Sequence, residues 1–470
     1  MPGFCHCTNV AKNPICILSR VSLHLLLPAY RISLGLYQGI IQAAAWLGHP
    51  KALALVRGRS ETLEILHDIR RSQGDSPAPP TVWFHAASTG EVEQAKPLMQ
   101  AWKALHPHDR LVLSVYSPSA YRSGKDPYPA DLCLMMLGDQ PDLVALWMDT
   151  LRPYRAFFVK YEYWYFHWKA LGQNKIPLVM ICARLHAQSG VLKPWFRPLW
   201  QEMAGWVTCF AVQDPGTLEI LKDQGLRRAV WVGDTRFDRV VERAETDFSD
   251  PVFSALTKNL TNEAILVAGS TWERDENLLL RTWQALKQRA GSRPGTLAWK
   301  LILVPHEWNK ARQKDLERRW KRLAPELRWV YYSQASQNLE QLKPVTEADV
   351  VVVDQSGLLS RLYRYGKAAW IGGGFGAGIH NSLEAAVYGL PLAFGPRYRT
   401  FPEAVSLVDQ KMAFPIQDQG SLGVRDLVAF LDKAGAYTPD LHQQIKDQIL
   451  ANTGATQRIL ELDLSNSSLT

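Results

Sequence analysis

Short apolar runs alternate with amphipathic stretches through most of the chain, and this alternation predicts its architecture. A first series of strands is predicted at residues 81–86, 111–115, 156–160, 177–182, 207–212 and 229–232. A second series is predicted at residues 265–268, 301–304, 328–332, 350–353, 369–371 and 391–393. Helical patterns, such as 92–105 and 215–224, lie between several of these strands. Because strands that alternate with helices are typical of parallel sheets with crossover helices, we expect an α/β protein.

Two such series in one chain predict two Rossmann-like domains that face each other across a cleft. We place the first domain at residues 80–240 and the second at residues 262–430, with their junction within 235–262. Residues 431–470 are expected to form helices that close the second domain and to end in a polar tail. Residues 1–28 form an N-terminal extension without an assignment.

An uncharged apolar stretch near the N-terminus predicts a membrane-associated helix. It runs from Ile32 to Gly48, is 17 residues long, and belongs to an anchor region at residues 29–60. This length is at the lower limit for a membrane span, so we expect a helix that is embedded in the membrane or barely crosses it. The basic residues that follow the stretch would face anionic headgroups, and they are Lys51, Arg57 and Arg59. The alternative is a buried first helix of a soluble domain.

Charge and cysteine content narrow the kinds of partner and compartment. The net charge of +8 suits an acidic partner, such as an anionic lipid or a phosphorylated substrate. Nucleic acid is not expected, because the basic residues are dispersed and no zinc-finger or helix-turn-helix signature is present. Six cysteines in 470 residues are too few for a disulfide scaffold, which indicates a reducing compartment. The spacing in Cys5-His6-Cys7 is too tight for an ordinary zinc site, so no metal is expected.

The stretch TVWFHAASTGEVEQAKPL, residues 81–98, places a carboxylate at a turn. An apolar strand ends in small residues, Ser88-Thr89-Gly90 form a tight turn, and Glu91 falls in the first turn of the next helix. Ligands bind at the carboxyl edge of parallel sheets in open α/β folds, so Glu91 is a candidate catalytic residue. The alternative is that Thr89 caps the helix and Glu91 only complements its dipole.

A second stretch, AAWIGGGFGAGIHNSLEAAVYGLPLAFGP at residues 368–396, combines glycines with polar side chains. An apolar strand runs into Gly372-Gly373-Gly374, and His380-Asn381-Ser382 then leads into a helix that carries Glu384. Glycines let backbone N–H groups approach an oxyanion closely, and a carboxylate further along can hold ribose hydroxyls. The combination predicts a nucleotide-binding site.

These stretches resemble those of GT-B glycosyltransferases and, more narrowly, of the 3-deoxy-D-manno-octulosonic acid (Kdo) transferases of lipopolysaccharide synthesis. The stretches that carry the resemblance, in the family's order, are HAASTGEVEQAKPL (85–98), YEYWYFHW (161–168), ARLHAQS (183–189), GDTRFDR (233–239), AGST (268–271) and GIHNSLEAA (378–386). The amphipathic N-terminal segment is similar to the family's membrane anchor.

The chain also departs from the family pattern near the donor. Trp272 stands where the family usually has histidine after G-S-T, and Pro305-His306-Glu307 stands where it usually has P-R-H. The family's G-E-L segment reads Gly357-Leu358-Leu359. A basic residue expected near the donor is therefore replaced, and Lys310 or Arg312 is a candidate for the missing cation.

The resemblance implies an inverting transfer of Kdo from CMP-Kdo to a lipid A precursor, lipid IVA, at the cytoplasmic face of the bacterial inner membrane. It implies that Glu91 is the catalytic base and that CMP-Kdo is a substrate and not a cofactor. No metal is expected, because the sequence has no paired aspartate motif for Mg²⁺. The helix start would keep Glu91 ionised but would lower its basicity. The donor-binding residues implied are Ser270, Thr271, His306, Gly373, Gly374, His380, Asn381 and Glu384. The residues implied for the acceptor or for Kdo itself are Ser88, Gly90, Glu162 and Arg184.

Other functions stay open at this stage. Another membrane-associated GT-B enzyme that uses a UDP-sugar would have a similar donor half. A non-hydrolysing UDP-sugar epimerase shares the architecture but needs no membrane segment. A catalytically inactive, lipid-binding relative is a further alternative, because the P-R-H and G-E-L segments are altered. For Arg184, an ion pair across the cleft is the alternative to ligand binding.

Overall fold

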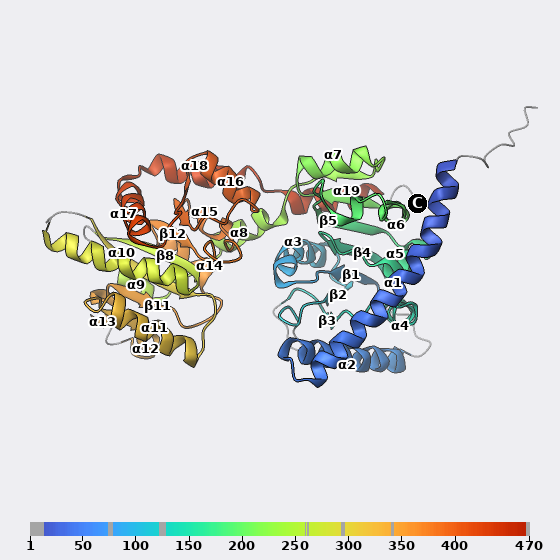
Figure 1. Cartoon of the computed structure of the whole chain (residues 1–470), viewed down its shortest axis with the longest axis horizontal. Coiled ribbons are helices and arrows are strands. Elements are labelled where there is room, and N and C mark those ends of the chain that lie inside the picture. The colour runs from blue at the N-terminus through green and yellow to red at the C-terminus, as the bar shows by residue number, and fades with distance from the viewer. Residues whose placement is uncertain are drawn as a thin grey trace, which may run out of the picture. The chain divides into compact units, whose positions relative to one another are not determined.

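The computed structural model describes residues 14–73, 79–121, 128–258, 260, 263–292, 297–339 and 343–466. Cys5-His6-Cys7 and the rest of residues 1–13 lie outside the described residues. The chain divides into two compact units (Figure 1). The first unit extends to Arg239 and resumes at Thr453, and the second runs from Val240 to Asn452.

The first unit is built on a seven-stranded parallel sheet with the order β3-β2-β1-β4-β5-β6-β7. Its strands are β1 (Thr81–His85), β2 (Arg110–Val115), β3 (Leu132–Met135), β4 (Pro153–Val159), β5 (Leu178–Ala183), β6 (Cys209–Val212) and β7 (Ala229–Trp231). The predicted parallel α/β architecture is confirmed for this unit. Strand β3 was not predicted.

The strands of this sheet are apolar throughout because both faces of the sheet are covered. In β1, Trp83 points into one hydrophobic cluster, whereas Val82 and Phe84 point into the cluster on the opposite face. All three side chains are fully buried. Strands that are buried on both faces have continuous apolar runs instead of alternating ones, and this is the pattern along β1.

Two helices precede the first strand of this unit, and further helices flank the sheet. They are α1 (Pro14–Trp46), α2 (Pro50–Gln73), α3 (Thr89–Leu105), α4 (Pro141–Leu151), α5 (Tyr165–Gln173), a 3₁₀ turn at Gly190–Leu192, α6 (Arg197–Gly205), α7 (Pro215–Asp223) and α19 (Ala455–Asn466). Helix α8 (Thr235–Glu245) contains the boundary between the units.

Helix α1 packs one apolar face on the first unit and leaves another exposed. Leu27, Tyr30 and Leu34 contact the core of the unit. Ile32, Leu36 and Ile40 recur every four residues, and each is more than 60% exposed. The alternative of a fully buried first helix is therefore wrong. Within the described residues, no helix has an apolar stretch that is long enough to cross a membrane.

Arg59 does not lie with the exposed basic residues, as the sequence analysis expected. Its side chain is 9% exposed, and its Nε–H donates to the carbonyl of Met136 (3.1 Å). The guanidinium also lies over the ring of Tyr116. Because a buried charge needs such partners, Arg59 joins α2 to the end of β3 and cannot face headgroups. Lys51 and Arg57 are exposed, as expected.

The second unit contains another seven-stranded parallel sheet, with the order β10-β11-β9-β8-β12-β13-β14. Its strands are β8 (Glu263–Thr271), β9 (Ala298–Pro305), β10 (Trp329–Tyr331), β11 (Val350–Val352), β12 (Ala368–Ile371), β13 (Leu392–Phe394) and β14 (Ala413–Pro415). Strand β14 was not predicted, and the others lie within or overlap the predicted runs.

Helices surround this sheet as well (Figure 1). They are α9 (Pro251–Lys258), α10 (Glu273–Ser292), α11 (Lys310–Leu323), α12 (Tyr332–Gln337), α13 (Lys343–Glu347), α14 (Leu359–Leu362), a 3₁₀ turn at Tyr363–Tyr365, α15 (Leu383–Ala386), α16 (Pro402–Asp409), α17 (Ser421–Ala436) and α18 (Pro439–Leu450). Helices α10 and α17 pack on the same hydrophobic core through Trp283 and Leu431.

The last helix corrects the expected domain boundary. Residues 431–470 were expected to close the second domain, but α19 belongs to the first unit. Ile459 and Leu460 are buried in the core cluster that also contains Leu98 and Met99 of α3. Asp238 accepts hydrogen bonds from Gly454 N–H (2.6 Å) and Thr456 N–H (2.7 Å), so it caps the start of α19. The GDTRFDR stretch thus provides the site where the start of α19 docks.

We expect the substitution Asp238→Ala to destabilise the first unit by about 1–2 kcal/mol, because loss of a helix N-cap costs this much. Denaturant unfolding followed by circular dichroism measures the effect. Asp223→Ala, at the exposed end of α7, is the matched control and should change stability by no more than about 0.5 kcal/mol. Equal stability of both variants would show that Asp238 does not hold α19.

Candidate active site

Glu91 lies at the carboxyl edge of the first sheet, where β1 leads into α3. Ser88 is the N-cap residue of α3, with extended backbone angles. The N–H of Ser88 donates to Oε2 of Glu91 (3.0 Å), so the carboxylate folds back over the helix start. This is the reciprocal arrangement of a capping box, in which Ser88 is the cap and not Thr89. The side chain of Glu91 is only 8% exposed.

The surroundings of Glu91 raise its pKa above the ordinary value. Burial is the largest cause, and the negative charge of Glu162 adds to it. The Ser88 N–H and the positive charge of Lys160 act in the opposite direction but do not prevail. The N–H at the helix start does lower the pKa of Glu91, as expected from the sequence, but burial outweighs this effect and the net shift is upward.

Glu162 is shifted in the opposite direction. Burial disfavours its charged form, but hydrogen bonds from His85 and Trp164 outweigh burial and lower the pKa of Glu162. Nε2 of His85 lies 3.3 Å from Oε2 of Glu162, and Nε1–H of Trp164 donates to the same oxygen at 2.9 Å. Glu91 and Glu162 are therefore a pair of nearby carboxylates with opposite pKa shifts, which is typical of acid–base sites.

His85 is a residue of this site that the sequence analysis did not single out. It is the last residue of β1 and is fully buried. Its Nδ1 lies 2.7 Å from Oγ of Ser114, which also accepts a hydrogen bond from Nε1–H of Trp83 (2.7 Å). His85 is thus held from both sides. Because an ionised carboxylate only accepts hydrogen bonds, the proton that His85 shares with Glu162 is on Nε2.

Lys160 and Cys182 take backbone angles at this sheet edge that non-glycine residues rarely adopt. Their φ values are 58° and 50°, and the pairing of β5 with β6 shifts register at Cys182. Bulges and left-handed residues re-aim side chains next to active sites. Burial lowers the pKa of Lys160, and the charge of Arg236 lowers it further. No sequence pattern indicates this lysine beyond its place after a strand.

Two other residues implied for the acceptor, Gly90 and Arg184, differ in their surroundings. Gly90 is exposed, and a side chain in its place would meet open space, so sterics do not require glycine there. Arg184 pairs with Asp214 of the same unit, with 4.0 Å between Nε and Oδ2. Asp214 is also the N-cap of α7. Arg184 is thus in a long ion pair, with a side chain that is 20% exposed.

Gly373 and Gly374 form a turn after β12, at the carboxyl edge of the second sheet. Gly373 has a φ of 90°, and its N–H donates to Oδ2 of Asp275 (2.9 Å). From the sequence we expected this N–H to bind a phosphate. Because it donates to Asp275, it is not available for that role. A Cβ on Gly374 would lie 2.6 Å from the backbone of Gly395, so glycine is needed for close packing.

Asp275 connects the glycine turn to the end of β8, and the sequence analysis missed it. It is 1% exposed and also accepts hydrogen bonds from the N–H of Trp272 (2.9 Å) and Nε1–H of Trp370 (3.3 Å). Burial raises the pKa of Asp275 to about 6, despite these donors. An acidic residue three positions after the helix cap was the signal that could have identified it.

The hydroxyl of Thr271 points into the interior and not toward a ligand. It donates to Oε1 of Glu276 (3.2 Å), and both residues are buried. Glu276 also accepts hydrogen bonds from Arg312 (2.7 Å) and Arg319 (2.7 Å). Arg312, a candidate for the missing cation, is therefore committed to a buried ion pair.

Aromatic rings gather beside the glycine turn. The rings of His306 and His380 stack with centroids 4.2 Å apart, and the ring of Trp272 lies 4.8 Å from that of His306. Nε1–H of Trp272 donates to Nε2 of His380 (3.0 Å). Burial and the neighbouring His306 lower the pKa of His380 to about 4, so His380 is neutral at pH 7 and carries its proton on Nδ1. The replacement of the family's histidine by Trp272 thus creates a partly exposed aromatic surface.

Asn381, Glu384 and Ser270 complete the predicted donor residues. Nδ2–H of Asn381 donates to Oε1 of Glu384 (3.3 Å), and Oδ1 of Asn381 accepts from Leu383 N–H (3.1 Å), so Asn381 orients the carboxylate. Ser270 has a φ of 52° at a register shift in β8, next to the glycine turn. The second sheet therefore also has a bulge at the edge where candidate ligand residues lie.

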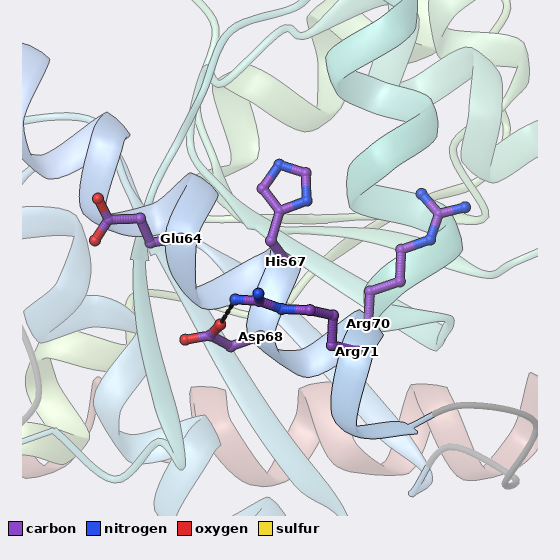
Figure 2. A pocket seen from close by; sticks show the side chains of 5 residues that line it. All are labelled: Glu64, His67, Asp68, Arg70 and Arg71. Atoms are coloured by element: carbon purple, nitrogen blue, oxygen red, sulfur yellow. Dashed lines mark hydrogen bonds and ion pairs between the residues drawn. The ribbon is translucent and has the colours of Figure 1, made fainter.

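A surface hollow on α2 is separate from these residues. Figure 2 shows its lining side chains, which are Glu64, His67, Asp68, Arg70 and Arg71. All come from one helix, and Asp68 and Arg71 form an ion pair. No residue predicted for catalysis or donor binding lines this hollow, so it is not a candidate active site.

Comparisons with known proteins show which family the chain resembles. The family model described as 3-deoxy-D-manno-octulosonic-acid transferase matches residues 59–239. The 3-deoxy-D-manno-octulosonic acid transferase of Haemophilus influenzae is 23% identical over 401 residues, which cover 82% of this chain and 87% of that protein. The enzyme of the same name from Aquifex aeolicus is 25% identical, over 67% of this chain and 76% of that protein.

Solved structures support the fold alone. The UDP-GlcNAc 2-epimerase of Neisseria meningitidis has a TM-score of 0.55 and 12% identity, over 82% of this chain and all of that one. A putative UDP-N-acetylglucosamine 2-epimerase from Listeria monocytogenes has a TM-score of 0.53 and 13% identity, over 84% of this chain and 98% of that one. Both confirm the GT-B-like pair of parallel α/β sheets. Together with the ordered motifs, the family model and the curated relatives show that the chain is similar to the 3-deoxy-D-manno-octulosonic acid transferases.

Proposed function

We propose that the chain is an inverting glycosyltransferase that transfers Kdo from CMP-Kdo to the lipid A precursor lipid IVA. Similarity to the transferase family supports the donor and the reaction. The single observation that supports a catalytic role for this chain is Glu91, a buried carboxylate with a raised pKa at the carboxyl edge of the first sheet. A general base works best when its pKa is near the working pH, and a raised pKa brings Glu91 closer to it.

The proposed reaction is a single displacement. Glu91 takes the proton of an acceptor hydroxyl while that oxygen forms a bond to the anomeric carbon of Kdo. The bond from this carbon to the phosphate oxygen breaks, its electron pair stays on the phosphate, and CMP leaves. Glu162, which His85 and Trp164 hold ionised, keeps Glu91 basic through its negative charge. No cofactor takes part, and CMP-Kdo is a substrate.

The second unit supplies the donor site in this proposal. The stacked rings of His306 and His380, together with Trp272, form an aromatic surface on which a nucleobase can stack. Glu384, oriented by Asn381, suits the ribose hydroxyls. Thr271 and Gly373 have a structural role in this proposal. The Thr271 hydroxyl donates to Glu276, and the Gly373 N–H donates to Asp275.

The exposed stripe of α1 supports association with the cytoplasmic face of the inner membrane. Ile32, Leu36 and Ile40 would insert among lipid chains, while Lys51 and Arg57 would face anionic headgroups. An enzyme that lies on the membrane surface can reach the headgroup of a lipid acceptor.

Substitution of Glu91 by glutamine should lower the turnover number for Kdo transfer by about 10²- to 10⁴-fold, the usual loss when a general base is removed. The glutamine side chain still accepts from the Ser88 N–H, so the helix start is retained. The assay incubates the protein with CMP-Kdo and lipid IVA and measures the lipid product by mass. Glu93→Gln, on the same helix, is the control and should be near wild type. Undiminished transfer by Glu91→Gln would remove Glu91 from this role.

The pH dependence of kcat/KM gives a further prediction. Transfer should rise with pH as Glu91 loses its proton, so the acidic limb reports the raised pKa of Glu91. Glu162→Gln removes a negative charge that raises this pKa. The limb should therefore move to lower pH in Glu162→Gln. A limb that stays in place, or moves to higher pH, would refute the coupling of the two carboxylates.

Leu36→Glu should weaken membrane binding, because it puts a charge into the exposed apolar stripe. Sedimentation with vesicles that contain anionic phospholipid measures the bound fraction, and we expect a loss of about tenfold in affinity, since burying a leucine side chain is worth about 1.5–3 kcal/mol. Gln42→Glu adds the same charge at an exposed polar position of α1 and is the control. Equal binding of Leu36→Glu and wild type would exclude the stripe as the membrane contact.

A further inference from the structure

Two arginines hold the glycine turn of the second unit from outside. Arg274, in the first turn of α10, donates from Nη1 to the carbonyl of Phe375 (3.0 Å). Arg397, after β13, donates from Nη1 to the carbonyl of Gly376 (2.5 Å). The two guanidinium groups thus bind carbonyls of consecutive residues, although they come from segments far apart in the chain. Arg274 and Arg397 are both exposed.

The segment that carries Arg397 is fixed against the same turn by its backbone. Its N–H donates to the carbonyl of Gly374 (3.0 Å), and its carbonyl accepts from the N–H of Ile379 (3.2 Å). On the other side of the turn, Asp275 holds Gly373 and lies next to Arg274 in the chain. Both guanidinium groups are therefore placed by bonds to the turn itself, which lowers the entropy they would lose on binding a ligand.

The positive charges of these arginines are not neutralised by carboxylates. Across the part of the chain that the structure describes, neither Arg274 nor Arg397 forms an ion pair, and each has one Nη1 contact to a carbonyl. In contrast, Arg312 binds both Glu276 and Asp315. Arg312 is thus occupied, and the histidine at position 306 has replaced the arginine of the family's P-R-H segment. Because guanidinium N–H groups bind anions well, an anionic ligand suits the remaining N–H groups of Arg274 and Arg397.

We propose that Arg274 and Arg397 bind the phosphate of the nucleoside monophosphate donor and so replace the cation that this chain lacks at the P-R-H position. The inference rests on the proposed function, since it takes CMP-Kdo as the donor. Guanidinium groups bind phosphate in bidentate fashion and stabilise the negative charge that develops on the leaving CMP. Their place beside the turn also puts them near the stacked rings proposed for the base.

The test compares a charged and a neutral ligand. In Arg274→Gln and Arg397→Gln the positive charge is lost, while the side chain keeps a polar N–H donor. Isothermal titration should show that each variant binds CMP about tenfold more weakly than wild type, a typical loss for a charge-assisted hydrogen bond. Binding of cytidine, which has no phosphate, should stay unchanged. Arg399→Gln, whose side chain lies over Tyr398, is the control and should bind both ligands as wild type does.

The outcomes separate this inference from the proposed function. If wild type binds CMP and the Arg274 and Arg397 variants bind it equally well, the inference is overturned while the proposed function stands. If the variants lose CMP and cytidine in equal measure, the arginines only shape the turn, and the inference fails. If wild type binds no CMP, the proposed donor is wrong. Retention of charge in Arg274→Lys and Arg397→Lys should restore part of the CMP affinity.

Discussion

The first unit depends on how two carboxylates share one sheet edge. Glu91 is buried and accepts a hydrogen bond from the backbone N–H of Ser88, whereas Glu162 receives hydrogen bonds from His85 and Trp164. Burial acts on both, but only Glu162 has enough donors to overcome it, so the two pKa values move in opposite directions. The ionised Glu162 then opposes the ionisation of Glu91. One short motif and one strand-end segment thus produce a stable anion and a basic carboxylate side by side.

The second unit uses a buried carboxylate for a different purpose. Asp275 accepts the N–H groups of Trp272 and Gly373, which belong to two neighbouring strand ends, and fixes the shape of the glycine turn. This leaves the carbonyls of the turn for Arg274 and Arg397. The N–H of Gly373 therefore shapes the turn, and the side chains of Arg274 and Arg397 gather around its carbonyls. Trp272 and His306, which differ from the family pattern, also lie beside this turn, where their rings contact each other.

The sequence predicts the sheets and the position of Glu91 well, because both depend on local patterns. Continuous apolar runs mark strands that are covered on both faces, and Glu91 follows such a run after small residues. Strand β3, LCLM, was missed because an apolar run without β-branched residues fits a helix equally well. The docking of α19 on the first unit, the burial of Arg59 and the upward pKa shift of Glu91 were also missed. Each depends on contacts between residues that are far apart in the chain, which a local pattern does not contain.

The central claim is that the two carboxylates titrate in a fixed order, with Glu162 ionised first. A carbon-13 NMR titration of the protein with labelled glutamate side chains measures this order, and the Glu91→Gln and Glu162→Gln variants assign the two signals. The account predicts that Glu162 loses its proton below the ordinary glutamate range and that Glu91 loses its proton above it. Titration of Glu91 at or below the pH at which Glu162 titrates would contradict the account.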